Sequence, residues 1–265
     1  MFYYLVFFYS QFFVNLPAPT SDFSGQTVVV TDGDKGLGLE AAKLLVQLRA
    51  SKVILAVRSI KAGQDAAAHI IESTRARLPI VEVWPFDLTS TESIQEFARR
   101  AAKLDRLDAV ILNAGIESHT LQLINGMEAH VAVNLVGPVL LGLLLLPKLR
   151  GTASKLGAPT RMTFVGSNAQ YGVSLDELKT PGSLLELLSE PDGVKKSGRF
   201  VNAITYCQRS PDKLTSTSNV SSYVDLPLSS SFSSMLSVSL PCAARLLQTR
   251  MSSSLTIRRA CAGAP

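Results

Sequence analysis

The sequence predicts an α/β protein built on a doubly wound parallel sheet, in a single domain followed by an irregular C-terminal tail. Short apolar runs alternate with helical stretches of roughly 10 to 20 residues, the order that parallel sheets with helical crossovers require. Polar motifs stand directly after the predicted strands, where open α/β sheets bind their ligands. The chain has 265 residues and is 46% hydrophobic, which is sufficient for one large core.

Each predicted strand is a short run of β-branched or apolar residues, and each predicted helix repeats apolar residues at helical spacing. The predicted strands are residues 28–30, 52–56, 80–84, 107–112 and 161–165. The predicted helices are residues 39–49, 60–77, 91–102 and 126–149, with a mild interruption of the last at Gly137-Pro138. The connections between parallel strands are expected to be right-handed.

The stretch 27–40, which reads TVVVTDGDKGLGLE, passes from a strand through a glycine-rich loop into a helix. Glycine lets the backbone approach a pyrophosphate closely, and the start of a helix offers free N–H groups and the positive end of its dipole. The pattern therefore predicts a phosphate-binding junction at Gly33, Gly36 and Gly38. A tight turn that binds nothing is the alternative that the loop alone leaves open.

Charge and cysteine content argue against several classes of protein. The formal net charge is +5, but no basic stripe interleaved with aromatic residues is present, so no nucleic-acid partner is predicted. The cysteines Cys207, Cys242 and Cys261 are odd in number and widely spaced. They predict a reduced, cytoplasmic compartment rather than a disulfide framework or a zinc site. The three histidines show no ligand spacing, so neither a metal nor any role is assigned to them.

Residues 1–22 form a separate apolar and aromatic N-terminal segment. Its first sixteen residues carry no charge and lack the basic start of a signal peptide. They are also shorter than the about 20 residues that a spanning helix needs. Three interpretations stay open: a helix laid over an apolar groove, a peripheral membrane contact through residues 1–16, and a membrane anchor.

Five motifs in a fixed order resemble those of the short-chain dehydrogenase/reductase family, over about residues 20–200. The runs GLGLEAAKLL, VILAVRS and VEVWPFDL are similar to the retinol-dehydrogenase-like branch common in filamentous fungi. The resemblance implies a Rossmann-type dinucleotide-binding domain at 23–204. It also implies an oxidoreductase that interconverts a ketone and a secondary alcohol on a hydrophobic small molecule, in fungal secondary metabolism. The motifs are Thr31-(xxxx)-Gly36-Leu37-Gly38, Asp87-Leu88, Asn113-Ala114-Gly115, Asn134 in an apolar helix, and Ser167 after the fifth strand.

The resemblance implies a nicotinamide dinucleotide as the cofactor, and the cationic residues of the chain favour NADP. Proteins of this fold that use NADP have an arginine near the ribose for its 2′-phosphate. In this chain Arg58 follows the second predicted strand, with Lys61 close behind and Lys35 in the glycine loop. Three cations around one predicted pocket favour NADP over NAD. Asp87 matches the family's contact to the adenine side, and Asn113 the stretch that stabilises the central sheet beside the cofactor.

The family pattern T-G-x-x-x-G-x-G is met only in part. Its last positions are matched by Gly36, Leu37 and Gly38, which are expected to form the cofactor-binding turn. Asp32 stands where the family has its first glycine. With Asp34 it places two carboxylates in a loop expected to face phosphate, where like charges are costly, and Lys35 is expected to offset that cost in part.

The candidate catalytic residues are Asn134, Ser167 and Tyr206. The resemblance implies that Asn134 bonds the helix backbone and a water in a proton relay, and that Ser167 hydrogen-bonds the carbonyl oxygen that becomes an alkoxide. The chemistry also needs a tyrosine with a lysine one helical turn further on. No tyrosine of the chain has that lysine: Tyr206 is followed by Ser210 there, and in a second alignment Phe200 takes the place of the tyrosine.

The composition changes where the catalytic pair is missing. Residues 205–265 form a Ser-rich segment that is expected to be poorly ordered and shows no recognisable sixth strand. We interpret this as a departure of the coding frame from the family near residue 200, through a frameshift or a retained intron. Absence of a Tyr-x-x-x-Lys pattern from the other two frames of the gene would count against this interpretation.

Two further expectations concern partners and activity. The resemblance implies a homodimer through the helix at 126–149, because the family pairs its subunits through this helix. The missing catalytic pair leaves a second function open, a catalytically impaired homologue that binds nucleotide weakly or serves as a dimer partner.

Overall fold

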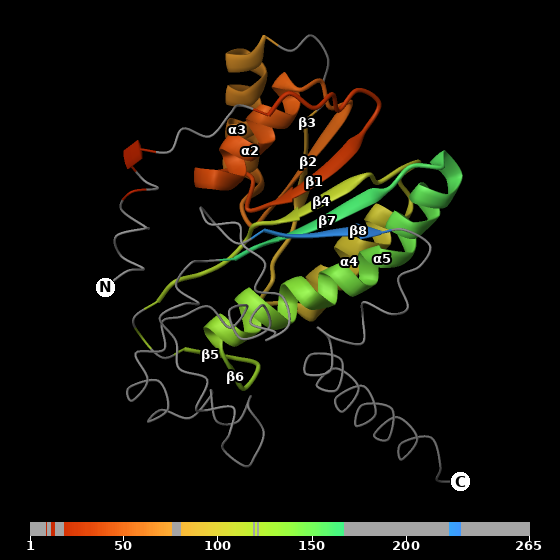
Figure 1. Cartoon of the computed structure of the whole chain (residues 1–265). Helices are drawn as coiled ribbons and strands as arrows, with labels where there is room; N and C mark the ends of the chain where they lie inside the picture. The colour runs from red at the N-terminus through yellow and green to blue at the C-terminus, as the bar shows by residue number, and fades with distance from the viewer. Residues whose placement is uncertain are drawn as a thin grey trace, which may run out of the picture.

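The computed structural model describes residues 9, 12–13, 19–75, 81–118, 120, 122–166 and the backbone of residues 223–228. Six strands form one sheet in the order β3-β2-β1-β4-β7-β8 (Figure 1). The first five in this order are parallel, which confirms the predicted doubly wound sheet. The strands are β1 (Thr27–Thr31), β2 (Lys52–Val57), β3 (Val81–Pro85), β4 (Ala109–Leu112), β7 (Thr160–Val165) and β8 (Tyr223–Leu228).

Helices cover both faces of the sheet, with α2 and α3 on one face and α4 and α5 on the other (Figure 1). Successive residues of β1 point to opposite faces, so Val28 and Val30 join the core beside α2 and α3 while Val29 joins the core beside α4 and α5. Burial on both faces explains why β1 and β2 read as continuous apolar runs. The helices are α2 (Gly36–Gln47), α3 (Ile60–Thr74), α4 (Thr91–Ala102) and α5 (Gly137–Leu156).

The helix predicted at 126–149 begins later than the sequence indicated. Asn125 and Gly126 have φ angles of 52° and 77° and join two short antiparallel strands, β5 (Leu123–Ile124) and β6 (Met127–Glu128). A two-residue hairpin turn with positive φ at both positions is the turn that an Asn-Gly pair favours. The prediction of a helix over this part of the chain is therefore wrong, because the turn chemistry prevails over the apolar pattern.

The same helix also ends later than predicted. A π-helical turn, η1 (Val131–Val136), leads into α5 at Gly137, which is where the sequence predicted an interruption. α5 then continues past Pro147 and ends before Gly157, whose φ of 61° is the left-handed conformation that closes many helices.

One stripe of α5 is buried against the sheet. Leu141, Leu145 and Leu149 follow one another at four-residue spacing and are fully buried, each contributing roughly 1.5–3 kcal/mol to stability. The combined helix Val131–Leu156 is apolar and long enough to cross a membrane by length and composition. However, 56% of its apolar window is buried inside the protein. Within the described part of the chain it therefore behaves as a core helix.

A sixth strand, β8, pairs antiparallel with β7 at the edge of the sheet. The sequence analysis did not find this strand, which lies inside the Ser-rich segment 205–265. Its Pro227 has no N–H to donate, and an edge position is where a sheet tolerates proline. Apart from β8, the segment lies outside the described residues, so its predicted lack of order stays a prediction.

Candidate functional site

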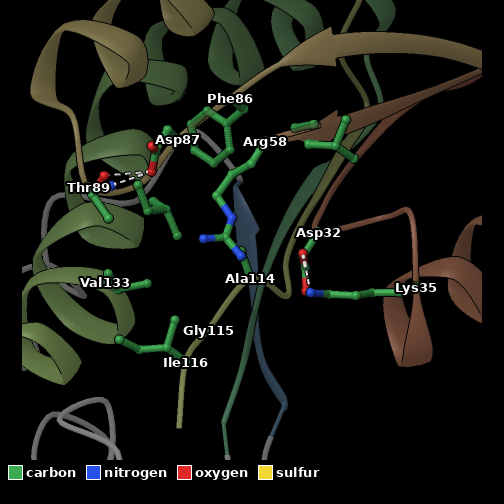
Figure 2. A pocket seen from close by; sticks show the side chains of 13 residues that line it. Asp32, Lys35, Arg58, Phe86, Asp87, Thr89, Ala114, Gly115, Ile116 and Val133 are labelled. Atoms are coloured by element: carbon green, nitrogen blue, oxygen red, sulfur yellow. Dashed lines mark hydrogen bonds and ion pairs between the residues drawn. The ribbon is translucent and has the colours of Figure 1, made fainter. Parts of the chain in front are cut away.

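A pocket opens at the carboxyl ends of β1, β2, β3 and β4, the edge of the sheet where the sequence predicted a ligand (Figure 2). Its position follows from the parallel order, because all four strands end at the same edge. Charged and polar side chains line one part and apolar side chains the other. The polar residues are Asp32, Lys35, Arg58, Asp87 and Thr89; the apolar ones include Ala56, Val57, Phe86, Ala114, Ile116 and Val133.

The glycine turn brings the start of α2 to this pocket. Gly36, with φ of 52°, is the first residue of α2, and Leu37 beside it is 73% exposed. Gly38 is buried so closely that a Cβ at its position would lie 2.2 Å from the carbonyl oxygen of Asp32 and 2.8 Å from Nδ2 of Asn113. Gly38 is therefore required for the approach of α2 to the sheet, a role that the spacing of the motif did not reveal.

The first turn of α2 has no side-chain cap. Its N-cap residue, Lys35, makes no capping hydrogen bond, whereas Ser59 caps α3 and Ser90 caps α4 through hydrogen bonds from backbone N–H groups. The first N–H groups of a helix need an acceptor from outside the helix. At α2 a phosphate is an acceptor of the right charge, since the dipole of the helix favours an anion there.

Asp32 lies in this pocket with a φ of 55°, at the position where the family pattern has glycine. Aspartate adopts this left-handed conformation more readily than most residues. Its Oδ1 lies 3.9 Å from Nζ of Lys35. Burial raises the pKa of the Asp32 carboxyl; Lys35 and Arg58 oppose this and Asp34 adds to it, with a raised pKa as the result.

Of the three cations predicted around the cofactor, the structure brings two to the pocket. Figure 2 shows the Arg58 side chain reaching from the end of β2 into the crevice, and Lys35 beside Asp32 on the other wall. Lys61 is not among the lining residues. It lies exposed on the first turn of α3, which packs its opposite side against β2 and β3 so tightly that a Cβ on Gly63 would lie 2.5 Å from Val83. Lys61 therefore does not line the pocket, and its predicted contact with the cofactor stays a prediction.

Asp87 follows β3 and is held by an Asx turn. Its Oδ1 accepts hydrogen bonds from the backbone N–H of Thr89 at 2.9 Å and from the Thr89 hydroxyl at 2.8 Å, while its own N–H donates to the hydroxyl of Ser93. Its Oδ2 makes no hydrogen bond within the described part of the chain. The carboxylate is thus fixed in orientation, with one oxygen left for a ligand in the pocket.

Asn113 ties the ends of β1 and β4 together. The Thr31 hydroxyl accepts hydrogen bonds from the backbone N–H groups of Asn113 and Ala114, both at 2.9 Å. In return, Nδ2 of Asn113 donates to the Thr31 carbonyl at 3.2 Å. Asn113 does not line the pocket; it fixes the edge of the sheet on which Ala114 and Gly115 do.

Asn134 lies on η1 and is 1% exposed. Its Oδ1 accepts from the backbone N–H of Ile116 at 2.8 Å, and its Nδ2 donates to the Ile116 carbonyl at 2.9 Å. A buried amide without partners would be costly, and here both of its ends bind one residue of the segment that follows β4. These two hydrogen bonds fix the wall of the pocket that Gly115 and Ile116 form. Asn134 lies in a π-helical turn, a feature that is frequent at functional sites.

The buried pair Glu128 and His130 was missed by the sequence analysis. The two residues are 7% and 6% exposed, and the imidazole Nδ1 lies 2.7 Å from Oε1 of Glu128. Nε2 of His130 accepts from the N–H of Ser118 at 3.0 Å, which places the ring proton on Nδ1. Burial opposes ionisation of Glu128, but hydrogen bonds from the His130 side chain and from the backbone of His130 and Val131 prevail and lower its pKa.

Through these hydrogen bonds Glu128 and His130 hold the loop that follows β4 against the start of η1. An acid three residues ahead of an apolar helix is the signal that could have revealed it, because Oε2 of Glu128 accepts from the first backbone N–H groups, those of His130 and Val131. Serine or aspartate is the more usual residue to cap the first N–H groups of a helix, and here glutamate does so.

Replacing His130 by leucine is expected to lower the free energy of unfolding by about 2–4 kcal/mol, because Oε1 of the buried Glu128 loses its hydrogen bond from the imidazole and the N–H of Ser118 loses its acceptor. Urea unfolding followed by circular dichroism measures the change. The matched control is His69→Leu, at an exposed position of α3, where a change within about 0.5 kcal/mol is expected. Equal effects of the two substitutions would contradict a structural role of the buried pair.

Ser167 and Tyr206 lie outside the described residues, as do the three cysteines. Ser167 follows Gly166, the last described residue after β7. Within the described ranges no group of three histidine, cysteine or acidic side chains is placed to hold a metal ion.

A parallel sheet with an uncapped helix start and a charged crevice at its carboxyl edge defines a Rossmann-type α/β protein. The family model of the short chain dehydrogenases matches residues 26–169, and the chain belongs to this family.

Fungal relatives are similar over most of the described part. The short-chain dehydrogenase anuD of Penicillium roqueforti is 42% identical over 196 residues, 74% of this chain and 51% of that protein. The short chain dehydrogenase sol3 of Alternaria solani is 40% identical over 199 residues, 74% of this chain and 69% of that protein. The chain spans about half of the length of several curated relatives that it matches. Among solved structures, the Pseudomonas aeruginosa RhlG/NADP active-site complex matches with a TM-score of 0.49 and 25% identity, over 59% of each chain.

Proposed function

We propose that the protein binds NADP(H) in the crevice above the glycine turn and interconverts a ketone and a secondary alcohol on a hydrophobic small molecule, as part of fungal secondary metabolism. The observation that carries the proposal is the convergence of Arg58 and Lys35 on one pocket beside the uncapped start of α2. An arginine near the ribose suits the additional phosphate of NADP.

The residues of the pocket fit a phosphorylated dinucleotide. The free N–H groups of α2 suit the pyrophosphate, and the guanidinium of Arg58 and the ammonium of Lys35 suit the 2′-phosphate. Oδ2 of Asp87 suits the amino group of adenine, with Phe86 and Ala114 as apolar surface for the ring. Asp32 and Asp87 are the two lining carboxylates; Asp32 lies on the wall where the phosphates are expected, so its charge opposes this ligand.

The dinucleotide, when bound, supplies or accepts the hydride of the reaction. The protein's part is to orient the carbonyl and to move a proton. From the family resemblance, the hydroxyl of Ser167 donates a hydrogen bond to the carbonyl oxygen and so stabilises the developing alkoxide. Asn134 holds the wall at Ile116, and Tyr206 is the candidate proton donor in this chain.

A second candidate function is favoured by one observation in the sequence. No tyrosine of the chain is followed four residues later by lysine, so the usual means of lowering the pKa of the catalytic phenol is missing. A catalytically impaired homologue would bind the nucleotide and turn over carbonyl substrates slowly or not at all.

Titration with NADPH and NADH, followed by tryptophan fluorescence, tests binding. Trp84 is the single tryptophan, and its ring centroid lies 5.4 Å from that of Phe97. The Phe97 ring centroid in turn lies 4.9 Å from that of Phe86, which lines the pocket. Quenching by NADPH at a lower concentration than by NADH is expected, whereas absence of quenching and of calorimetric heat with both would reject the proposal. Oxidation of NADPH by hydrophobic ketones then separates an enzyme from an impaired homologue, with Ser167→Ala as the control for background turnover.

The homodimer through the helix at 126–149, the peripheral membrane contact through residues 1–16 and the cytoplasmic location stay predictions. Of the N-terminal segment, the described Tyr9, Phe12 and Phe13 are 62%, 75% and 72% exposed, and the Tyr9 and Phe13 rings stack.

A further inference from the structure

The dinucleotide pocket contains a carboxylate, that of Asp32, on the wall where the phosphates of the ligand are expected. We propose that Asp32 is a specificity-determining residue: binding of a dinucleotide that carries a 2′-phosphate is coupled to proton uptake by Asp32, so that Asp32 weakens this binding at neutral pH. The inference rests on the proposed function, because it assumes that the phosphorylated ligand enters this pocket.

The first step of the argument is the set of charges around Asp32. Lys35 in its own loop lies 3.9 Å from its Oδ1, and Arg58 at the end of β2 lines the same pocket. Asp34 lies in the same loop, and Asp87 at the end of β3 faces the crevice from the other side. In the free protein Asp32 therefore acts as the counter-ion of the two cations that a phosphate would also need.

The second step concerns what the ligand changes. Burial already raises the pKa of the Asp32 carboxyl, and the charges of Lys35 and Arg58 limit that rise. Phosphate groups that pair with the two cations remove this limit and add negative charge close to the carboxylate. Both effects raise the pKa of Asp32 further in the complex, so a proton binds with the ligand.

The sign of the pH dependence follows from this linkage. Below the pKa of Asp32 in the free protein the carboxyl is neutral in both states and opposes nothing. As the pH rises from there to the higher pKa of the complex, the penalty grows, and the affinity for NADPH falls. The 2′-phosphate itself loses a proton at about pH 6 and then pairs more strongly with Arg58 and Lys35. This second effect raises the affinity for NADPH as the pH rises, opposite to the effect of Asp32. Asp32→Asn retains the phosphate's contribution and removes only that of Asp32.

The backbone permits this substitution. Asparagine, like aspartate, adopts a positive φ readily, so Asp32→Asn keeps the conformation at φ of 55° and removes the charge. Asp32→Gly restores the family pattern at the same φ and serves as a second variant. The matched control is Asp34→Asn, in the same loop but outside the pocket lining, which changes the net charge by the same amount.

The experiment is calorimetric titration of the full chain with NADPH and with NADH between about pH 5 and about pH 8, in two buffers of different ionisation enthalpy, to count protons. At the upper end of this range Asp32→Asn and Asp32→Gly are expected to bind NADPH about ten-fold more tightly than the unmodified protein. A ten-fold change in affinity corresponds to a difference of about one unit between the pKa of Asp32 in the free protein and in the complex. Proton uptake on binding is expected to be smaller in both variants than in the unmodified protein, and Asp34→Asn is expected to resemble the unmodified protein.

Binding of NADPH by all four proteins with the same pH dependence and the same proton uptake would overturn the inference and leave the proposed function standing. An equal gain in Asp34→Asn would also overturn it, because the effect would then come from net charge and not from the pocket carboxylate. Absence of dinucleotide binding by every protein would overturn the proposed function, and the inference with it.

Discussion

Replacing Arg58 by alanine is expected to raise the dissociation constant of NADPH about 100-fold and to leave that of NADH nearly unchanged. The guanidinium lies in the pocket at the end of β2 (Figure 2), where the 2′-phosphate is the group that distinguishes the two dinucleotides. A hydrogen bond between charged partners contributes roughly 1.5–3 kcal/mol, and about 1.4 kcal/mol corresponds to a ten-fold change in affinity. Fluorescence titration of the variant with both dinucleotides measures the change.

The controls for this prediction come from the same surface. Lys61→Ala removes a cation that the sequence placed in the pocket and the structure places outside it, and little change in NADPH binding is expected. Arg58→Lys retains the charge but loses the two-pronged geometry, so an intermediate loss is expected. An effect of Lys61→Ala as large as that of Arg58→Ala would mean that general positive charge, and not the pocket, attracts the ligand.

Replacing Gly38 by alanine is expected to lower the free energy of unfolding by about 3 kcal/mol, as overpacking of a tight contact does, and to abolish binding of both dinucleotides. The added Cβ would lie 2.2 Å from the Asp32 carbonyl oxygen, and that atom belongs to the backbone, which cannot rotate away. α2 would have to move from the sheet, and its N–H groups would move with it. Urea unfolding and NADPH titration of the same sample measure the two effects.

The matched control is Gly151→Ala, which places the same methyl group on a helix with open space around it. Alanine in a helix is more favourable than glycine by roughly 0.5–1 kcal/mol, so this variant is expected to be slightly more stable than the unmodified protein. If both variants lost stability equally, the close approach of α2 to the sheet would not be the cause.

Much of the fold could be predicted from the sequence because its signals are local. β1 and β2 are continuous apolar runs, and the helices that alternate with the strands repeat apolar residues at helical spacing, so the order of elements alone implies crossovers and a parallel sheet. The polar residues that follow the strands then meet at one edge, which is how Arg58 and Asp87 were predicted to share a site. Ser167 also follows a predicted strand, but its role was taken from the family resemblance, and it lies outside the described residues.

The structure departs from the sequence-based picture at three places, each for a different reason. Lys61 follows Arg58 by only three residues, yet α3 intervenes and presents Lys61 to solvent while Gly63 packs on the sheet. The helix was predicted to begin at Gly126 because the apolar pattern that follows is helical, but the turn preference of the Asn125-Gly126 pair proved stronger. β8 was missed because its partner β7 is about 60 residues away, and strand pairing over such a distance leaves little trace in a single sequence.

The sequence by itself determined the class of the protein, the parallel sheet and the end of it at which charged residues gather, since these follow from periodicity and chain order. Only the tertiary structure decided which of those residues share a pocket: Lys35 and Arg58 line it, Lys61 does not, and Asp32 lines it beside Lys35 as a counter-ion. It also decided that His130 and Glu128 are buried partners. The reason is physical: side-chain direction depends on how each helix packs on the sheet, and that packing is set by contacts such as those at Gly38 and Gly63, between residues far apart in the chain.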